Sequence, residues 1–326
     1  MLMKGTSIPA NTSKMLSSID DKYIYCLVGN SIHIFDTIEN KTIKRLHGLR
    51  NSNMIISSDG RYLGCIHPKG RSVEVCVYDI RDDHREVLRD SIQGEFSTIA
   101  PCFTYDNKYI LLCNGVMQNN VWCVDLLCGA HDCIYKCGEN YTISNIDSGK
   151  YGILVSVCNG TSFAPLGYHV YFSSATSIPE IIDFEMENVS QSFIGDIHGG
   201  MVFETNWLDG SKAVVAYRAR SWKTKFQIVD FSNNHAITPS EDYSIPYSML
   251  QGIVLSRNKE YAACVVAKYD NVSGKVENRA YVFRTCDGKE YFSQGKNYLW
   301  DIRFLNKNAG LLISSSIPEI EEMVFE

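Results

Sequence analysis

Short apolar runs alternate with polar turns along the whole chain, and one kind of turn recurs. It contains an aspartate or asparagine followed by a lysine or arginine, and a short apolar segment comes directly after it. The clearest copy is Asp59-Gly60-Arg61, which precedes the apolar residues 62–66. The basic residues of the seven copies are Lys22, Arg61, Lys108, Lys150, Lys212, Lys259 and Lys307.

The spacing of these turns predicts the architecture. Successive basic residues are 39, 47, 42, 62, 47 and 48 positions apart. A period in the forties that is built from short strands is typical of a β-propeller and not of a helical solenoid. We therefore predict an all-β protein, a seven-bladed propeller of four-stranded antiparallel blades.

The second repeat shows the strand order that we expect in every blade. Its four predicted strands are residues 53–58, 62–66, 73–79 and 85–88. The first two are nearly continuous apolar runs, as expected of strands that are buried between neighbouring sheets. The fourth is more polar, which suits an outer edge.

We expect a single propeller domain over residues 1–326. The predicted blades cover approximately residues 12–46, 52–89, 97–137, 140–184, 200–239, 247–294 and 297–326. The last blade supplies only three strands, at residues 299–304, 311–314 and 322–325. Residues 1–8 are expected to add its outer strand, because joining both chain ends in one blade removes an exposed edge and closes the ring.

The ends of the third strands carry a family resemblance. They contain an aromatic residue and an aspartate, as in Phe35-Asp36 and Tyr78-Asp79. Together with the turn at residues 58–63, this pattern resembles WD40-type repeats, most clearly over the first three repeats. The Trp-Asp dipeptide is missing from these strand ends, and the Gly-His signature has only a reversed counterpart at His47-Gly48. The resemblance implies a WD40-like propeller.

The 12 cysteines could indicate either core packing or a metal site. A group in the third repeat lies close to His131 and consists of Cys102, Cys113, Cys123, Cys128, Cys133 and Cys137. Structural zinc sites usually show paired cysteines on turns with two to four residues between them, and these cysteines fall mostly on separate strands. The same second-strand position also recurs as cysteine in four repeats, at Cys26, Cys65, Cys113 and Cys264. We therefore expect small buried side chains and no metal, with a metal site in the third repeat as the alternative.

Composition limits the class of partner and the compartment. The net charge of −6 argues against non-specific binding of nucleic acid, which requires clustered lysine and arginine. No segment approaches the about 20 apolar residues that a membrane-spanning helix needs, and residues 1–18 do not resemble a secretion signal. We expect a cytoplasmic protein with reduced cysteines, no membrane association and no nucleic-acid partner.

No catalytic motif is present in the sequence. It lacks the nucleophile elbow Gly-x-Ser-x-Gly, the zinc motif His-Glu-x-x-His, the phosphate-binding Gly-x4-Gly-Lys-Ser/Thr and the dinucleotide motif Gly-x-Gly-x-x-Gly. We therefore predict no catalytic residues, no cofactor and no enzymatic activity. The alternative is a small-molecule- or metal-dependent propeller enzyme, similar to hydrolases or lactonases, that uses the central channel.

Loop length points to a binding face instead. The loops between the second and third strands of blades four, five and six are expected to be long, at residues 159–167, 217–223 and 268–275. The connection at residues 187–200 should open on the same face. Long loops often serve function, and exposed aromatic and arginine side chains anchor protein interfaces.

From these loops we predict a non-catalytic interaction platform, the scaffold, sensor or adaptor subunit of a larger assembly. It would bind a protein or peptide on the loop face of blades four to six, by aromatic burial and arginine pairing. The predicted anchors and their polar neighbours are Phe163, Asp196, His198, Arg218, Arg220, Trp222 and Tyr269.

Overall fold

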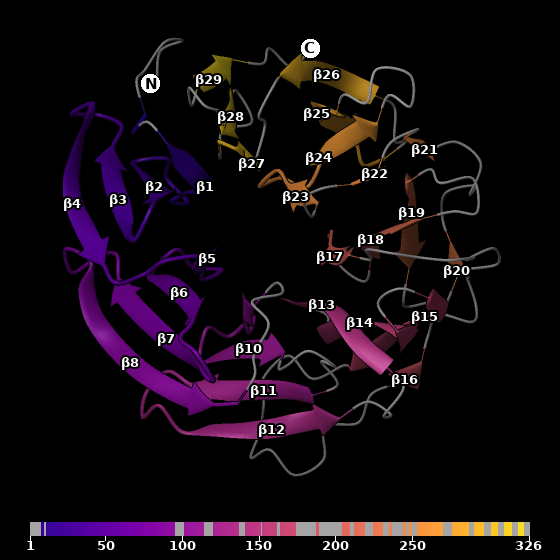
Figure 1. Ribbon diagram of the computed structural model, residues 1–326, viewed down its shortest axis with the longest axis horizontal. Coiled ribbons are helices and arrows are strands. Elements are labelled where there is room, and N and C mark those ends of the chain that lie inside the picture. The colour runs from indigo at the N-terminus through magenta and orange to yellow at the C-terminus, as the bar shows by residue number, and fades with distance from the viewer. Residues whose placement is uncertain are drawn as a thin grey trace. The chain divides into compact units, whose positions relative to one another are not determined.

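The computed structural model describes most of the strands and the turns of the first three sheets. The described residues are 8–9, 11–94, 101–113, 120–136, 141–150, 152–161, 164–173, 187–188, 204–208, 212–218, 224–230, 235–236, 244–245, 248–249, 253–269, 276–286, 290–296, 301–305, 310–314 and 319–322. Every regular element within them is a β-strand (Figure 1). No helix in this part of the chain has the length and apolar character needed to cross a membrane.

Contacts divide the chain into two compact units. The first comprises Met1–Asn51, Trp222–Thr224 and Glu241–Glu326, and the second comprises Ser52–Ser221 and Lys225–Ser240.

The second unit holds four sheets in which strands adjacent in the sequence pair with each other. They are β5 (Asn53–Ile56), β6 (Tyr62–Pro68), β7 (Ser72–Asp79) and β8 (Arg85–Gln93); β9 (Cys102–Phe103), β10 (Tyr109–Cys113), β11 (Asn120–Asp125) and β12 (His131–Lys136); β13 (Tyr141–Gly149), β14 (Gly152–Thr161), β15 (Ala164–Ser173) and β16 (Glu187–Asn188); and β17 (Glu204–Trp207), β18 (Lys212–Arg218), β19 (Thr224–Asp230) and β20 (His235–Ala236). The four strands predicted for the second repeat are confirmed as β5 to β8.

The first unit holds the sheets formed by the two ends of the chain. They are β1 (Thr12–Ser17), β2 (Tyr23–Val28), β3 (Ser31–Asp36) and β4 (Lys41–His47); β22 (Ser248–Met249) and β23 (Val254–Leu255), both paired with β24 (Tyr261–Tyr269), then β25 (Val276–Arg284) and β26 (Glu290–Lys296); and β27 (Asp301–Phe304), β28 (Gly310–Ser314) and β29 (Glu319–Glu322). Strand β21 (Ser244–Ile245) is a two-residue segment.

The end of the chain corrects one prediction. The last strand was expected at residues 322–325, but β29 covers Glu319–Glu322. Its register with β28 places Ile320 opposite Leu312, so cross-strand pairing of apolar residues accounts for the earlier start. The expected closing strand at residues 1–8 lies almost entirely outside the described residues. Ile8 is described, and it is buried in a cluster that also contains Met15 and Leu305.

The recurring polar turn owes its form to a buried hydroxyl group. In the sheet of β5 to β8, Ser57 Oγ donates to Asp59 Oδ1 at 2.7 Å and accepts the Tyr62 N–H at 2.9 Å. Asp59 Oδ1 also accepts the Arg61 N–H at 3.0 Å. The side chains thus satisfy backbone donors that the tight turn leaves without ladder partners.

Three further turns repeat these bonds. The hydroxyl, the acceptor and the tyrosine are Ser18, Asp20 and Tyr23 before β2; Thr104, Asp106 and Tyr109 before β10; and Ser256, Asn258 and Tyr261 before β24. All four hydroxyl residues are buried. The sequence pattern is therefore Ser/Thr-x-Asp/Asn-x-x-Tyr, and it is more specific than the Asp-Gly-Lys/Arg pattern from which the repeat was predicted.

The residue after the acceptor adopts a left-handed backbone in each of these turns. The φ angles are 59° at Asp21, 69° at Gly60, 58° at Asn107 and 62° at Lys259. Glycine, asparagine and aspartate tolerate this region best, which explains why the turn pattern favours them. The basic residue contributes through its backbone, since the carbonyl groups of Lys22, Arg61 and Lys108 accept N–H groups just beyond the third strand.

The aspartates that end β3, β7 and β11 have a common structural role. Asp36 Oδ1 accepts the N–H groups of Ile38 and Glu39 at 2.8 and 2.9 Å. Asp79 and Asp125 accept backbone N–H groups two residues ahead in the same way. The aromatic-Asp signature therefore marks the capped turn into the fourth strand.

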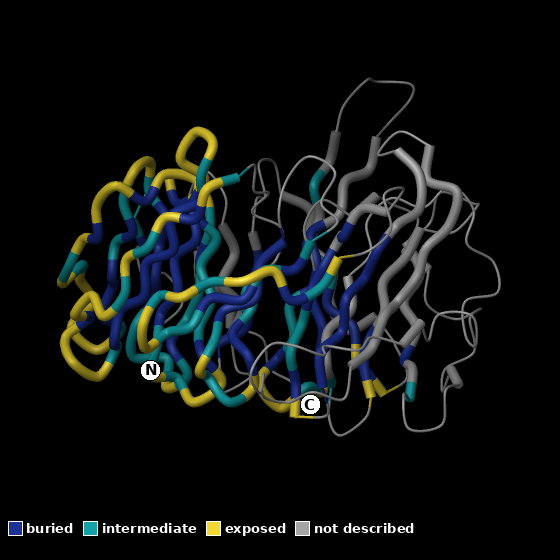
Figure 2. Tube along the Cα trace, turned by 90° about the horizontal axis from the view of Figure 1, so that it is seen from below, coloured by how far each residue is buried: buried dark blue, intermediate teal, exposed yellow. Residues whose placement is uncertain are grey.

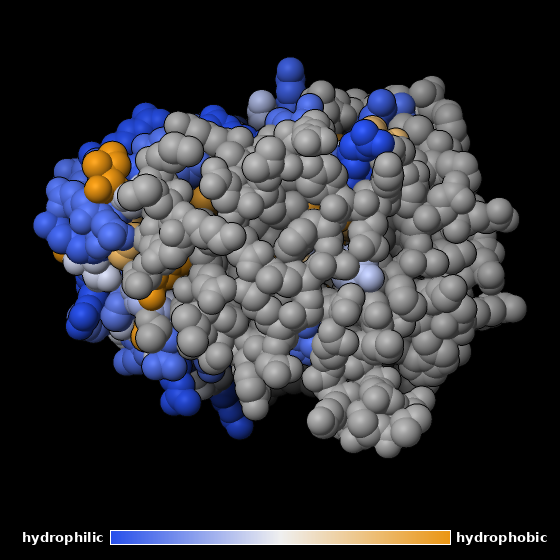
Figure 3. Space-filling view, turned by 90° about the horizontal axis from the view of Figure 1, so that it is seen from above, coloured by the Kyte–Doolittle hydropathy of each residue, from blue (hydrophilic) through white to orange (hydrophobic). Residues whose placement is uncertain are grey.

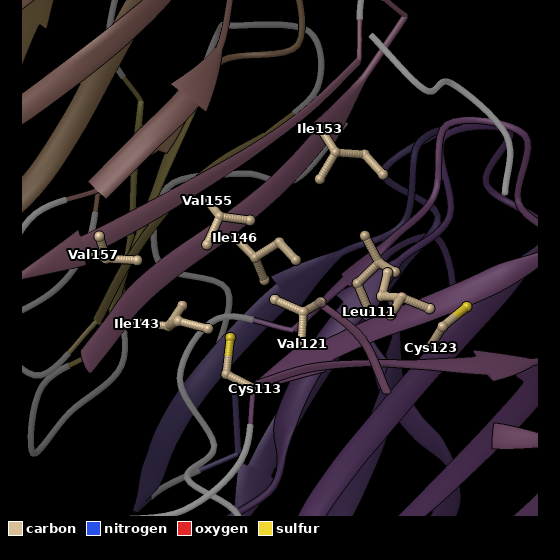
Figure 4. Packing of buried hydrophobic residues seen from close by; sticks show 10 residues of the cluster. Leu111, Cys113, Val121, Cys123, Ile143, Ile146, Ile153, Val155 and Val157 are labelled. Carbon is tan, nitrogen blue, oxygen red and sulfur yellow. The ribbon is translucent and has the colours of Figure 1, made fainter. Parts of the chain in front are cut away.

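Apolar side chains fill the spaces between neighbouring sheets of the second unit. Figure 4 shows Cys113 and Val121, from β10 and β11, facing Ile143 of β13, within a cluster that continues to Val155 of β14. Burial is greatest along the middle strands, whereas β4 carries exposed positions at alternate residues (Figure 2). The described surface seen in Figure 3 is mostly hydrophilic, with scattered hydrophobic residues. This is the pattern expected of sheets stacked face to face with polar outer edges.

We predict that Ser57→Ala lowers the free energy of unfolding by about 1–3 kcal/mol, because the buried Tyr62 N–H loses its acceptor. Urea unfolding would measure the change as a lower midpoint. Ser91→Ala is the matched control, since Ser91 is exposed, and it should change stability by less than about 0.5 kcal/mol. Equal stability of the two variants would contradict the role given to the hydroxyl group.

Candidate functional site

The predicted binding anchors lie outside the part of the chain whose side chains are described. Phe163, Asp196, His198, Arg220 and Trp222 fall outside the described residues altogether. The backbones of two others are described. Arg218 is the last residue of β18, and Tyr269 is the last residue of β24. The predicted binding face of blades four to six therefore stays a prediction.

The structure corrects the nature of the predicted long loops. Residues 159–167 were expected to form an irregular loop, yet β14 and β15 pair as far as Thr161 opposite Ala164. The β24–β25 hairpin likewise continues to Tyr269 opposite Val276. Backbone hydrogen bonds thus order most of residues 159–167 as strand, because each paired N–H and C=O finds its partner across the ladder.

A group of ionisable side chains lies on one face of the sheet β5 to β8. His67 of β6 is directly opposite Glu74 of β7, and Cys65 is opposite Cys76. Arg89 of β8 is opposite Cys76 in turn. Because residues two apart on a strand share a face, these side chains form a single row, which we call the polar row: Cys65, His67, Glu74, Cys76, Tyr78 and Arg89.

The other face of this sheet is apolar. Ile66, Val75 and Val77 pack in a cluster with Phe103 and Ile110 of the next sheet. The polar row is therefore not a stretch of outer surface but the second face of a core sheet, and Glu74 is only 7% exposed.

Glu74 is the centre of the polar row. Its Oε2 atom accepts a hydrogen bond from Arg89 Nη1 at 2.8 Å and lies 3.3 Å from His67 Nε2. Its Oε1 atom accepts one from Lys69 Nζ at 3.2 Å. The Cys76 thiol lies 3.8 Å from Oε2. Buried carboxylates need such partners, since an unpaired charge inside a protein is costly.

Arg89 joins this centre to the outer strand. Its Nε atom donates to both carboxylate oxygens of Glu86 at 3.0 Å, and its Nη2 atom donates to Tyr78 Oη at 3.3 Å. The guanidinium thus pairs with two carboxylates at once, one buried and one half-exposed. Its rigid fork suits this kind of bridge.

The surroundings set the protonation states of the polar row. Burial lowers the pKa of His67 more strongly than the Glu74 charge raises it, so the imidazole is neutral at pH 7. Burial raises the pKa of the Glu74 carboxyl, but the Lys69 hydrogen bond and the Arg89 charge outweigh this and lower it overall. Burial also raises the pKa of Cys76 to about 12, which keeps it a thiol. The arrangement therefore holds one carboxylate between two cations, beside a neutral imidazole and a thiol.

The prediction of buried cysteines at the recurring second-strand position is confirmed. Cys26, Cys65, Cys113 and Cys264 are all fully buried on second strands. In the third repeat, Cys113 and Cys123 belong to the apolar cluster of Figure 4, whereas Cys128 and Cys133 are exposed.

The third-repeat metal alternative gains no support from the described side chains. His131 Nδ1 lies 3.2 Å from Asp90 Oδ2 instead of beside the cysteines, and Cys137 is outside the described residues. Within the described part of the chain, ligand atoms of three candidate residues gather only at His67, Glu74 and Cys76.

Sequence reasoning missed the polar row, although a signal was present. Strand β7 was predicted at residues 73–79, and Glu74 is the one charged residue of that segment before its final aspartate. A glutamate inside a buried strand requires a partner on a neighbouring strand. His67 in β6 and Arg89 in β8 supply it, and only the cross-strand register identifies them.

Comparison with known proteins adds information on the fold. No protein-family model matches the chain, and no curated protein matches it in sequence. Among solved structures, it is similar to the β-propeller domain of Cps50 (Swd1) from Myceliophteria thermophila, with a TM-score of 0.67 and 12% identity over 98% of this chain and 99% of that one.

A second solved structure is similar to a comparable degree. It is an oligogalacturonate lyase in complex with manganese, with a TM-score of 0.62 and 12% identity over 95% of this chain and 88% of that one. At this identity the two likenesses establish the fold alone. The chain is an all-β propeller of antiparallel sheets.

We predict that Glu74→Gln lowers the free energy of unfolding by about 2 kcal/mol. Breaking a buried ion pair typically costs about 3–5 kcal/mol. The loss should be smaller here, because Arg89 retains its ion pair with Glu86 and the Lys69 side chain can turn to solvent. Chemical denaturation would measure it. Glu86→Gln is the control, and loss of its more exposed pair should cost at most about 1 kcal/mol.

The pH dependence of the stability difference between wild type and Glu74→Gln provides a second test. A carboxyl whose pKa in the folded protein is held below its ordinary value of 4.5 stabilises the fold above that pH. This contribution disappears as the pH falls through the folded pKa. The stability difference between wild type and Glu74→Gln should therefore shrink below pH 4.5, and a constant difference would show that Glu74 does not act as a carboxylate.

Proposed function

We propose that this protein is a non-catalytic interaction platform, a cytoplasmic scaffold or adaptor that binds a protein or peptide through its long second-to-third-strand hairpins. The length of these hairpins carries the proposal. Strands β14 and β15 have ten residues each, and β24 and β25 have nine, whereas β2 and β3 have six. At about 3.3 Å per residue, the extra residues lengthen each hairpin by roughly 10 Å or more.

In the sequence, the predicted anchors lie within these hairpins and within the β18–β19 hairpin, whose strands have seven residues each. Phe163 stands between β14 and β15, Arg218 ends β18, and Arg220 and Trp222 precede β19. Tyr269 ends β24. In this proposal the aromatic side chains bury themselves in the partner, and the arginines pair with its carboxylate or carbonyl groups. Asp196 and His198 would supply polar contacts beside them.

The cytoplasmic part of the proposal rests on the cysteines. The ten that are described are all free thiols, which is the state that a reducing compartment maintains.

The observation that separates this proposal from its alternative is the dependence of binding on the hairpin residues. The alternative is a propeller enzyme that uses a central channel for a small molecule or a metal. Its activity would not depend on Arg218 or Trp222. The manganese-bound lyase shares the fold with this chain, and so does the Cps50 domain, so fold likeness favours neither.

The test is an affinity capture with Arg218→Ala/Trp222→Ala beside the wild-type protein, followed by mass spectrometry. We expect a specific partner to be retained by the wild type and lost, by at least about tenfold, with the double variant, since two anchors of this kind contribute more than 1 kcal/mol each. Arg81→Ala/Tyr105→Ala is the matched control, because it removes one exposed arginine and one exposed tyrosine from turns of other sheets. Equal capture by all three proteins would refute the proposed face.

We also propose that the sheets form seven blades, closed by residues 1–8 as the outer strand of the last blade. Two contacts within the first unit support this. Arg303 Nε of β27 donates to the Met15 carbonyl of β1 at 2.9 Å, and Ile8 shares a cluster with Leu305.

Deletion of residues 1–10 should lower the melting temperature by several degrees. Loss of an edge strand should cost more than about 1 kcal/mol of stability, and each kcal/mol lowers the melting temperature by about 2–4 °C. Ile8→Ala in the full chain controls for the loss of one apolar contact and should have a smaller effect. If the melting temperature of the truncated protein is no lower than that of Ile8→Ala, residues 1–7 do not close the ring.

A further inference from the structure

The polar row contains one group of side chains with metal-ligand chemistry that the proposed function does not use. We propose that His67, Glu74 and Cys76 form a binding site for a divalent transition-metal ion of the zinc class, which clips β6 to β7. This inference is independent of the proposed interaction function.

The spacing of the ligand atoms carries the proposal. One nitrogen, one oxygen and one sulfur atom of these three residues all lie within 4.8 Å of one another. His67 Nε2 is 3.3 Å from Glu74 Oε2, and Cys76 Sγ is 3.8 Å from the same oxygen. Zinc bonds of about 2.0–2.3 Å in a tetrahedron place neighbouring ligand atoms roughly 3.3–3.7 Å apart. These two separations fall close to that range, and the third, between His67 and Cys76, is at most 4.8 Å.

The register of the sheet explains why the three residues meet. His67 and Glu74 are direct cross-strand partners, and Cys76 follows Glu74 by two residues on the same face. All three are buried, with exposures of 5%, 7% and 0%. Burial restricts their rotamers, so the ligand atoms are largely positioned before an ion binds.

The donor set selects the class of metal. An imidazole nitrogen, a carboxylate oxygen and a thiolate sulfur suit zinc or cobalt, whereas magnesium, calcium and manganese prefer oxygen ligands. The neutral His67 ring can offer an unprotonated nitrogen to the ion. Cys76 must lose its proton: the S–H bond breaks, the metal–sulfur bond forms, and the proton passes to the solvent, with no change of oxidation state.

Two cations compete with the ion for Glu74. The Lys69 ammonium bonds to Oε1, but its side chain is 66% exposed and can turn to solvent. Arg89 bonds to Oε2 at 2.8 Å and also pairs with Glu86, so it keeps a partner when the metal takes that oxygen. A bound ion would therefore replace a cation–carboxylate contact with a metal–carboxylate bond.

Cobalt titration of the wild type and cysteine variants distinguishes this site from adventitious binding to other thiols. Cobalt chloride is titrated into the reduced full-length protein, and the near-ultraviolet absorption of the cobalt–thiolate bond is followed. We expect one equivalent to bind with this absorption in the wild type. Cys76→Ser should abolish it, while Cys113→Ser, which alters a buried cysteine on the second strand of the next sheet, should retain it.

Lys69→Gln provides a second test that leaves the core unchanged, because Lys69 is a surface residue, whereas Cys76 is buried. Because Co²⁺ carries two charges, removal of one unit charge about 4 Å away in a largely aqueous setting should tighten cobalt binding by at least about fivefold. A wild-type protein without the thiolate absorption, equal absorption in Cys76→Ser, or an unchanged affinity in Lys69→Gln would each overturn the proposal.

Discussion

A buried hydroxyl group in four of the recurring turns is the constraint on which the structure around them depends. Ser18, Ser57, Thr104 and Ser256 each bond to a side-chain acceptor two residues on and to a tyrosine N–H five residues on. The pair of bonds turns the chain from the first strand into the second and fixes where the second strand begins. Because side chains alternate along a strand, this starting point also decides which residues face each neighbouring sheet.

The polar row is one consequence of that register. With Tyr62 as the first residue of β6, Cys65 and His67 share one face and Ile66 lies on the other. The apolar face packs on the next sheet, whereas the opposite face carries the carboxylate of Glu74 with its three nitrogen-bearing neighbours. A sheet can hold such a charge only when the partners come from adjacent strands, and here β6 and β8 provide them. The fold thus places a charged, hydrogen-bonded group of side chains inside one of its sheets.

Much of this architecture could be predicted from the sequence, because the strands and turns are specified locally. The Asp59-Gly60 turn, the ends of third strands at Asp36 and Asp79 and the buried cysteines at Cys65 and Cys113 all reflect interactions within a few residues or a repeated position. These expectations agree with the structure.

Other features depend on pairing between distant residues and could not be predicted. Gly160, Pro165 and Gly167 read as loop residues, yet their segment is paired strand in the hairpin of β14 and β15. Arg89 comes opposite Cys76 only through the pairing of β7 with β8. The predicted interface anchors rest on loop length and residue type alone, which identify candidates without fixing their geometry.

Amide hydrogen exchange at the four tyrosines that follow the turns tests the central role of the hydroxyl groups most directly. The amides of Tyr23, Tyr62, Tyr109 and Tyr261 are bonded to buried side-chain oxygens, so they should exchange only through global unfolding, at the slowest rates in the protein. The amides of Lys22, Arg61 and Lys108, which bond to exposed turn carboxylates, should exchange far faster. Tyrosine amides that exchange as fast as these neighbours would contradict the account.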